Sequence, residues 1–422
     1  MEKHRLELFP DVFLTILDTD RFRTNYLSLN ILRPLRQEEA AMNALLPDVL
    51  LRGCRICPDM REISVWLDQR YGAGVQPTVR KKGEVQAVGL FFDYVSERYA
   101  APEEDLTADI CALLGSFLLE PVLEDGAFRG DYVEGEKVNL CNAIMAQIND
   151  KRVYAALRLR QEMFAGEAYG VGKNGEKEQV EQITPRSLYD HYRYILGHSR
   201  IEIVFAGRTD QDHLIACLRQ ALSTLPRQFA DPVGTVPGPM PDAPRELSET
   251  LDVQQGNLVM GFRTGVDSAD PRYPAMLMFN GIFGGGITSK LFRNVREKMS
   301  LCYYASSGLD RFKGVMLVSS GIDPEKYDAA KDEILRQLEA CRAGEITEEE
   351  IVSVRNALCT ALRSSGDSLG RMEDFYLSQE IGGFDYTPED LLESVLAVTP
   401  EQIRQAAEAV RLDTVFFLKG EN

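Results

Sequence analysis

The chain of 422 residues is long enough for two or three domains, and its 44% hydrophobic content is typical of a globular protein. Its net charge of −18 argues against nonspecific DNA or RNA binding, which requires many lysines and arginines to neutralise phosphates. No apolar run reaches the ~20 residues of a membrane helix. The first residues, MEKHRLELFPDVF, lack the apolar core of a signal peptide, so we expect a cytoplasmic protein with no membrane or nucleic-acid partner.

The eight cysteines are scattered along the chain. Without a secretion signal, they are expected to be reduced thiols rather than a disulfide framework. Cys54 and Cys57 form a CxxC pair, a spacing found in redox and zinc sites, but no second pair stands at the spacing of a zinc site. We therefore favour a structural role for the pair.

The first half of the chain predicts strands first and helices afterwards. Apolar and polar residues alternate at 27–31, as in a half-buried strand, until Pro34 ends the pattern. The expected elements are strands at 13–17 and 27–31, helices at 38–51 and from Pro58, a hairpin over 78–95 that turns at Lys82 and Gly83, helices at 110–118 and 132–164, a helix from Thr184 and a strand at 201–205.

Residues 228–245 differ in composition from the rest of the chain, because prolines and glycines crowd this short segment. Such a composition is typical of a semi-extended linker. The linker separates an expected N-terminal domain, residues 1–227, from an expected C-terminal domain, residues 246–422.

The second half repeats the order of the first. Its expected elements are strands near Leu251 and at 258–262, helices at 274–282 and 289–299, a strand pair at 301–309 and 315–320, helices at 327–341, 348–362 and from Thr399, and a strand at 415–417. The stretches ITPRSLYDHY…IEIVFAG and VTPEQIRQAAEA…TVFFLKG share a Thr-Pro start and a strand that ends at glycine. This repetition predicts an internal duplication: two homologous α+β domains, each a largely antiparallel sheet covered by helices, arranged as a clamshell.

The stretch Gly281–Ser306, GIFGGGITSKLFRNVREKMSLCYYAS, has the richest local pattern. Its glycines 284–286 are expected to form a turn between two helices, and Thr288 or Ser289 can cap the second helix. Helical spacing predicts that the buried face of this helix is made by Leu291, Phe292, Val295 and Met299.

Arg296 lies near the end of this helix, and Tyr303 follows seven residues later at the start of a strand. A helix that leads into a strand can bring both side chains to one surface. A guanidinium with five N–H donors and a phenol together suit the carbonyls of an extended peptide. In the alternative interpretation, Arg296 pairs with a carboxylate and Tyr303 packs against the fold.

The same stretch resembles the C-terminal domain of the M16 peptidases, the insulinase and processing-peptidase superfamily. The matching motifs are SKLF from Ser289, VREK from Val295 and LCY from Leu301. The resemblance implies that Arg296 and Tyr303 contact the substrate backbone near the scissile bond. It also implies the metallohydrolase fold of the LuxS and processing-peptidase type in each domain.

In that family, HxxEH on the first long helix of the N-terminal domain binds zinc through its histidines, and its glutamate activates water. The equivalent stretch here is ALLPDVLLRGC, from Ala44 to Cys54. Ala44 and Asp48 stand at the ligand positions and Pro47 at the general-base position, so we expect this chain to hold no zinc. Within YVEGEK, Glu134 matches the third ligand more closely than Glu136, although a solvated helix face is the simpler interpretation.

The resemblance covers most of the chain and is greatest to the zinc-less partner in bacterial two-subunit M16 pairs, in the subgroup named for association with elongation factor P modification. It implies a non-catalytic subunit of a heterodimeric peptidase, with zinc only in an HxxEH-containing partner and a peptide as substrate. Two alternatives stay open. One is a stand-alone peptide-binding or scaffold protein, and the other is a zinc-independent hydrolase, for which neither the four histidines nor any Ser or Cys motif supplies a candidate site.

Overall fold

The computed structural model describes residues 2–420. Its strands are β1 (Glu2–Phe9), β2 (Val12–Asp18), β3 (Thr24–Pro34), β4 (Gly74–Lys82), β5 (Val85–Val95), β6 (Leu123–Glu124), β7 (Ala127–Phe128), β8 (Arg200–Gly207), β9 (Arg245–Thr250), β10 (Gly256–Arg263), β11 (Cys302–Asp310), β12 (Val315–Ile322) and β13 (Arg411–Lys419).

Its α-helices are α1 (Gln37–Leu50), α2 (Met60–Asp68), α3 (Leu106–Leu119), α4 (Gly130–Ala146), α5 (Lys151–Met163), α6 (Lys177–Gln182), α7 (Pro185–His198), α8 (Gln211–Ala221), α9 (Tyr273–Phe283), α10 (Tyr327–Arg342), α11 (Glu348–Ser365), α12 (Leu369–Gly382), α13 (Pro388–Ala397) and α14 (Pro400–Ala409). Short 3₁₀ turns are η1 (Glu97–Tyr99), η2 (Gln147–Asn149), η3 (Ala168–Gly170) and η5 (Pro324–Lys326), and η4 (Leu291–Lys298) is a π-helix. Within the described residues, no helix is both long and apolar enough to cross a membrane.

The chain divides into two compact units, each built from separated segments. Unit 1 comprises Met1–Met145, Val171–Gly234 and Ser368–Ile381, and unit 2 comprises Ala146–Gly170, Thr235–Asp367 and Gly382–Asn422. The units therefore differ from the contiguous ranges 1–227 and 246–422, because two segments of the chain have been exchanged between the halves.

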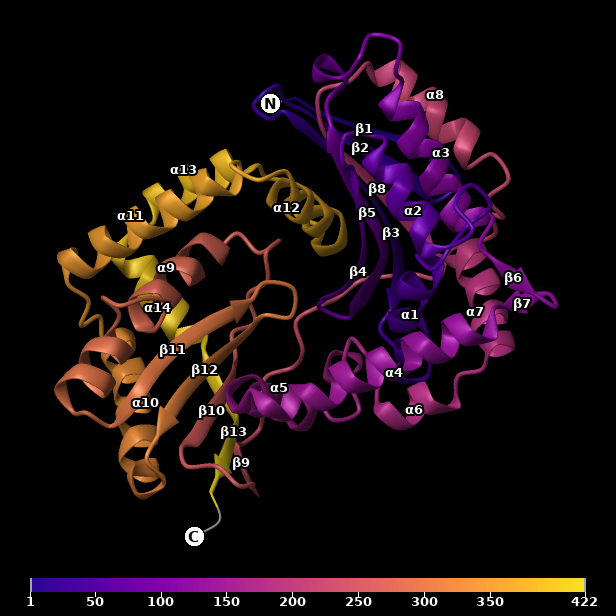
Figure 1. Cartoon of the computed structure of the whole chain (residues 1–422). Helices are drawn as coiled ribbons and strands as arrows, with labels where there is room; N and C mark the ends of the chain where they lie inside the picture. The colour runs from indigo at the N-terminus through magenta and orange to yellow at the C-terminus, as the bar shows by residue number, and fades with distance from the viewer. Residues whose placement is uncertain (1, 421–422) are drawn as a thin grey trace. The chain divides into compact units, whose positions relative to one another are not determined.

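Unit 1 is built on a sheet with the strand order β1-β2-β8-β3-β5-β4 (Figure 1). Its pairs are antiparallel except for the parallel pair β2 and β8. Helices α1, α3 and α7 pack against one face, where alternate strand residues such as Leu29, Val88 and Ile203 join the apolar core. Burial of this continuous apolar layer supplies the main driving force for folding of the unit.

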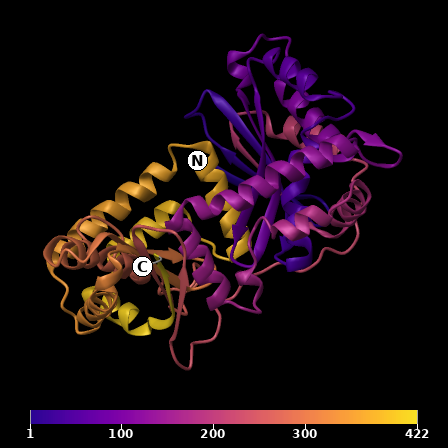
Figure 2. The ribbon, with the colours of Figure 1, turned by 60° about the horizontal axis from the view of Figure 1, so that its bottom comes forward.

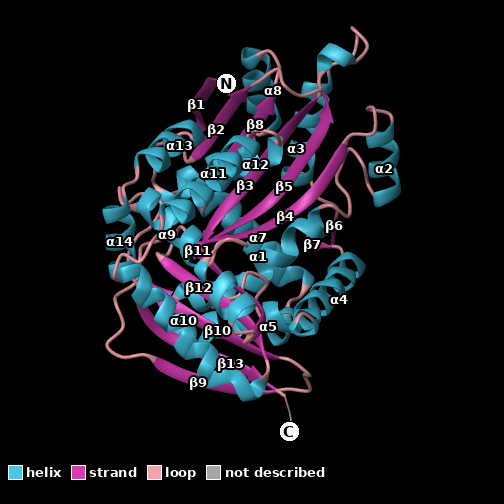
Figure 3. Cartoon of the chain, turned by 90° about the vertical axis from the view of Figure 1, so that its left-hand side faces the viewer, coloured by secondary structure: helices cyan, strands magenta, loops and turns pink. Residues whose placement is uncertain are grey.

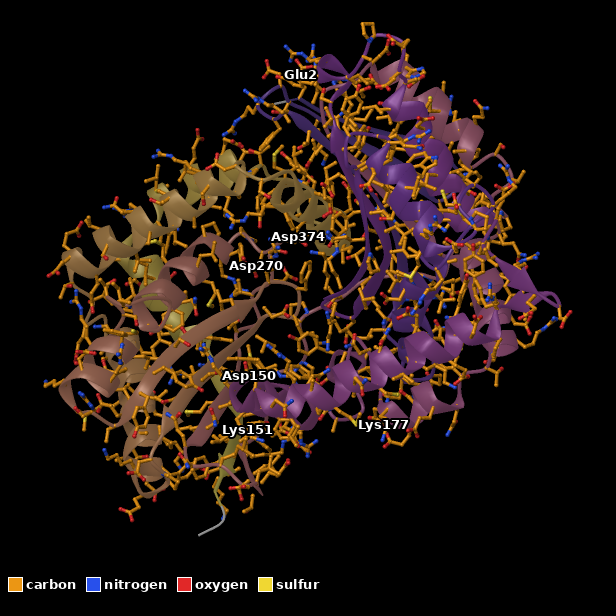
Figure 4. All side chains as sticks on the ribbon, in the orientation of Figure 1. Glu2, Asp150, Lys151, Lys177, Asp270 and Asp374 are labelled. Carbon is orange, nitrogen blue, oxygen red and sulfur yellow. The ribbon has the colours of Figure 1, made fainter. Side chains whose placement is uncertain are left out.

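Helix α12 packs against the sheet of unit 1 through polar side chains. Glu373 is fully buried and accepts hydrogen bonds from Ser28 and, through both carboxylate oxygens, from Arg80. Asp374, which Figure 4 labels, accepts from Lys82 at 2.6 Å. The orange-yellow helix therefore lies beside the indigo strands in Figures 1 and 2, although it is encoded in the second half of the chain.

Unit 2 is built on a sheet with the strand order β11-β12-β10-β13-β9, which Figure 3 shows in magenta. One face and the helices around it form an apolar core with residues from α9, α10, α11, α13 and α14. Helix α5 covers strands β10 and β13 through Ala155 and Leu159. This helix comes from the first half of the chain.

The two sheets share one topology. The order β4-β5-β3-β8-β2 in unit 1 corresponds to β11-β12-β10-β13-β9 in unit 2, and the last two strands of each series are parallel. The internal duplication and the largely antiparallel α+β sheets are therefore confirmed. The exchange is reciprocal. The sheet of unit 1 carries α12 from the second half of the chain, and the sheet of unit 2 carries α5 from the first half.

Most predicted strands and helices are present, with small shifts at their ends. Strands β1, β6 and β7 and helices α6, α8, α12 and α13 were not predicted, and the long helical region 132–164 is divided by η2 into α4 and α5. The strand expected near Leu251 lies slightly earlier, at β9, and the helix expected from Pro58 begins at Met60 after an Asp59 cap.

Candidate functional site

The helix that carries Arg296 is a π-helix rather than the expected α-helix. The Ser289 hydroxyl accepts a hydrogen bond from the Phe292 N–H at 3.3 Å, so the predicted serine cap is present. Leu291 and Val295 are buried as expected, whereas Met299 is 45% exposed. Met299 follows the last residue of the π-helix, Lys298, so it does not continue the buried face of the helix.

The backbone between Arg296 and Tyr303 turns sharply. Ser300 adopts a left-handed conformation with φ of 50°, which few residues other than glycine adopt. The Leu301 N–H donates to the Val295 carbonyl at 3.0 Å, which ties the start of β11 back to the π-helix. This connection places the two candidate residues on one side of unit 2.

Arg296 and Tyr303 line the same cavity, as the sequence predicted for one shared surface. The cavity has a volume of about 420 Å³, and its other lining residues are Glu297, Ser300, Leu301, Cys302, Asp323 and Lys326. Burial raises the pKa of the Cys302 thiol, although the Ser320 hydroxyl and the Arg296 charge oppose the shift, so this cysteine is held as a neutral thiol near neutral pH.

The polar groups of Arg296 and Tyr303 are available for a ligand. The Arg296 guanidinium lies over the Phe292 ring, 4.6 Å from its centroid, and its Nε is 3.6 Å from the Glu297 carboxylate. Within residues 2–420 the Arg296 side chain makes no hydrogen bond to a protein acceptor, and Tyr303 is 70% exposed. A packed Tyr303, the alternative interpretation, does not agree with this exposure.

The degenerate metal motif lies on α1, which continues through Pro47 without interruption. Ala44 and Pro47 are buried in the apolar core, and Asp48 is half-buried. Burial, together with the negative charge of Glu136, raises the pKa of Asp48 to about 6, while Arg52 acts in the opposite direction. The Arg52 guanidinium forms an ion pair with Glu136.

Of the two glutamates in YVEGEK, the structure places Glu136 rather than Glu134 beside Asp48. Glu134 is exposed and pairs with Lys137 at 3.1 Å, whereas Glu136 is buried against Arg52. Residues two positions apart in a helix point to nearly opposite sides, so only one of the two glutamates can face α1. Glu134, which matched the family pattern more closely, is therefore not part of this cluster.

These residues do not fit a zinc ion. Ala44 has no donor atom and Pro47 has no basic side chain. The Glu136 carboxylate is already paired with the Arg52 guanidinium. Across residues 2–420, no group of three or more His, Cys, Asp or Glu side chains could hold a metal ion.

Lys326 was not predicted as part of the site. It lies in η5, beyond the second strand of the hairpin, and it reaches the cavity only because β11 pairs with β12 so that Cys302 is opposite Ile322. No local motif marks this lysine, so only the strand register could have found it.

Comparisons with known proteins agree with this architecture. A family model described as "Peptidase M16 inactive domain" matches residues 182–358. The "Probable inactive metalloprotease YmfF" of Bacillus subtilis is 34% identical over 408 residues, which cover 96% of this chain and 95% of that protein. A conserved protein from Enterococcus faecalis superposes with a TM-score of 0.93 at 28% identity and covers 99% of both chains.

A "peptidase M16 inactive domain" from Pseudomonas fluorescens has a TM-score of 0.81 at 15% identity, over 100% of this chain and 99% of that one, which shows the fold alone. The fold is thus that of M16-type peptidases. The chain belongs to the M16 peptidase family. Its similarity to a relative named as inactive, together with the unsuitable donor set on α1, supports a non-catalytic member of that family.

Proposed function

We propose that this chain is the non-catalytic, substrate-binding subunit of a heterodimeric M16-type zinc peptidase that acts on peptides. An HxxEH-containing M16 partner supplies the zinc and its bound water. This chain supplies Arg296 and Tyr303. The cavity that these two side chains share, with their donors available, is the observation that carries the proposal.

The chemistry of the cavity suits a peptide backbone. A peptide in an extended conformation presents carbonyl oxygens, and both a guanidinium and a phenol donate hydrogen bonds to such acceptors. Charge-assisted hydrogen bonds from an arginine are stronger than those between neutral groups. The stacking of Arg296 on Phe292 limits the conformations of the side chain, so less entropy is lost when the peptide binds.

The proposal follows the resemblance to bacterial two-subunit pairs and to the subgroup associated with elongation factor P modification. It includes a cytoplasmic location, where the eight thiols stay reduced. The competing candidate, a stand-alone peptide-binding or scaffold protein, uses the same cavity without a partner. Co-purification from the native cell separates the two, because only the subunit is recovered with an HxxEH-containing M16 protein.

The decisive experiment measures peptide turnover by that complex with Arg296→Ala or Tyr303→Phe. Each lost hydrogen bond costs on the order of 1–3 kcal/mol, with the larger cost for the charged arginine. Turnover should fall about ten- to a hundredfold while the complex stays assembled. Arg296→Lys should also lower turnover, because an ammonium lacks the planar fork of donors.

Arg293→Ala is the matched control. Arg293 lies on the same π-helix but pairs with Glu349 at 3.3 Å and does not line the cavity. It should leave turnover unchanged. Full activity of a stably folded Arg296→Ala, Tyr303→Phe double variant would overturn the proposed substrate contact, and turnover that falls only in proportion to unfolded protein would assign both residues a structural role.

A further inference from the structure

The cavity of Arg296 and Tyr303 is also lined by a second cation, Lys326. Lys326 lies at the end of η5, and its Nζ donates a hydrogen bond to the Ser300 carbonyl at 3.0 Å. Within residues 2–420, Lys326 forms no ion pair, and its ammonium donates to the neutral Ser300 carbonyl. Two of its three N–H donors stay available.

In the part of the chain that the structure describes, the two carboxylates that line the same cavity, Asp323 and Glu297, form no ion pair with Lys326. Asp323 accepts a hydrogen bond from the Glu325 N–H at 3.3 Å and thereby caps η5. The Glu297 oxygen stands 3.6 Å from the Arg296 Nε, beyond hydrogen-bond distance, and the Glu297 side chain is 58% exposed. Neither acid therefore neutralises Lys326 or fills the donors of Arg296.

We propose that this cavity selects peptides that carry a carboxylate close to the backbone segment held by Arg296 and Tyr303, with Lys326 as its partner. The carboxylate is an Asp or Glu side chain or the C-terminal carboxylate of the peptide. The inference rests on the proposed function and adds a substrate class to it. A preference for acidic peptides is unexpected for a chain of net charge −18.

A local preference for a carboxylate is compatible with the negative net charge of the chain, because the two electrostatic effects act over different distances. At physiological ionic strength the Debye length is about 8 Å, so the distant negative charges are largely screened. A direct contact between ammonium and carboxylate is screened less. Because Lys326 is exposed, the contact is expected to change the Kd only about two- to fivefold.

The test measures binding to the whole chain of short, uncharged, extended peptides that carry a neutral fluorophore. One series has a single Glu or a single Gln at each position in turn, with an amidated C-terminus. A second series has no acidic side chain and either a free or an amidated C-terminus, which distinguishes the two sources of the carboxylate. Fluorescence anisotropy gives the Kd for the wild-type chain and for Lys326→Gln.

We expect one Glu position, or the free C-terminus, to bind two- to fivefold more tightly than its neutral counterpart, and Lys326→Gln to abolish that difference. Lys177→Gln is the matched control, because Lys177, labelled in Figure 4, lies on α6 of unit 1 and pairs with Glu181. Equal binding of all acidic and neutral peptides would overturn the inference while leaving the proposed function intact. Peptide binding that does not respond to Arg296→Ala would contradict the proposed function itself.

Discussion

At the scale of single residues, the cluster around Asp48 explains why these side chains do not fit a zinc ion. The Arg52 guanidinium provides a positive charge for Glu136, and burial and the Glu136 charge raise the pKa of Asp48 to about 6. The apolar side chains of Ala44 and Pro47 belong to the core instead.

The purified chain should therefore contain no stoichiometric zinc by elemental analysis. Replacement of the motif by Ala44→His, Pro47→Glu and Asp48→His should improve zinc binding more readily than peptidase activity, because Arg52 still competes for Glu136. One tightly held zinc per wild-type chain, lost on Glu134→Ala or Glu136→Ala, would show that these residues do form a metal site.

The raised pKa of Asp48 also makes stability depend on pH. The folded-state pKa of about 6 lies above the ordinary value of 3.8, so Asp48 stays protonated in the folded chain after it ionises in the unfolded one. Its destabilising effect is absent below about pH 4 and complete above about pH 6.

Asp48→Asn should therefore raise the melting temperature at pH 8 and change it little at pH 4. The gain is at most about 3 kcal/mol, and less to the extent that the half-buried group is solvated. Thermal melts of both proteins across this pH range measure the effect. A gain that is the same at pH 4 and pH 8 would assign it to packing rather than to ionisation.

At the scale of elements, the site depends on an unusual connection between η4 and β11. A π-helix is rare and is frequently found at functional sites, and the left-handed Ser300 that follows it allows the chain to reverse within a few residues. The π-helix carries Arg296 and the turn at Ser300 precedes Tyr303, and both side chains line one cavity.

Ser300→Val should destabilise the chain by about 1–2 kcal/mol, because a β-branched residue fits the left-handed region poorly. Ser300→Gly should cost nothing or stabilise slightly, since glycine adopts this conformation without strain. Urea unfolding of the two variants gives the comparison. Equal stability of the two would mean that the backbone at residue 300 is not constrained as described.

At the scale of the whole molecule, each unit is completed by a helix from the other half of the chain. Helix α12 is held on the sheet of unit 1 by ion pairs, of which the fully buried Glu373 with Arg80 is central. Helix α5 is held on the sheet of unit 2 mainly by apolar contacts, with Leu159 and Phe416 in one cluster. Neither half of the chain therefore contains all the elements of one unit.

Glu373→Ala should lower the free energy of unfolding by about 3 kcal/mol, because it leaves the buried end of Arg80 without its main partner. The cost is at the lower end of the range for a buried pair, since Asp374 stays 3.4 Å from Arg80. Glu373→Gln should cost less, because an amide oxygen still accepts hydrogen bonds.

Glu178→Ala, an exposed glutamate of α6, serves as the control and should be nearly neutral in the same denaturation experiment. Unchanged stability of Glu373→Ala would show that the ion pairs do not hold α12 in place.

The sequence by itself determined the features that depend on neighbouring residues. Alternating apolar residues predicted β3, the glycines at 83 and 314 marked both hairpin turns with positive φ, and the Thr-Pro starts at 184 and 399 form capping boxes. A third Thr-Pro pair, Thr387-Pro388, begins α13, so the same pattern could have predicted this helix. The duplication and the shared surface of Arg296 and Tyr303 followed from the same local patterns.

Only the tertiary structure decided features that depend on residues far apart in the chain. The exchange of α5 and α12, the choice of Glu136 over Glu134, and the approach of Lys326 to the cavity all depend on packing across many residues. Local propensity cannot specify them, because the mixed polar and apolar pattern of α12 does not indicate which sheet the helix packs against. The free energy that places such elements comes from buried contacts that form only when the chain is folded.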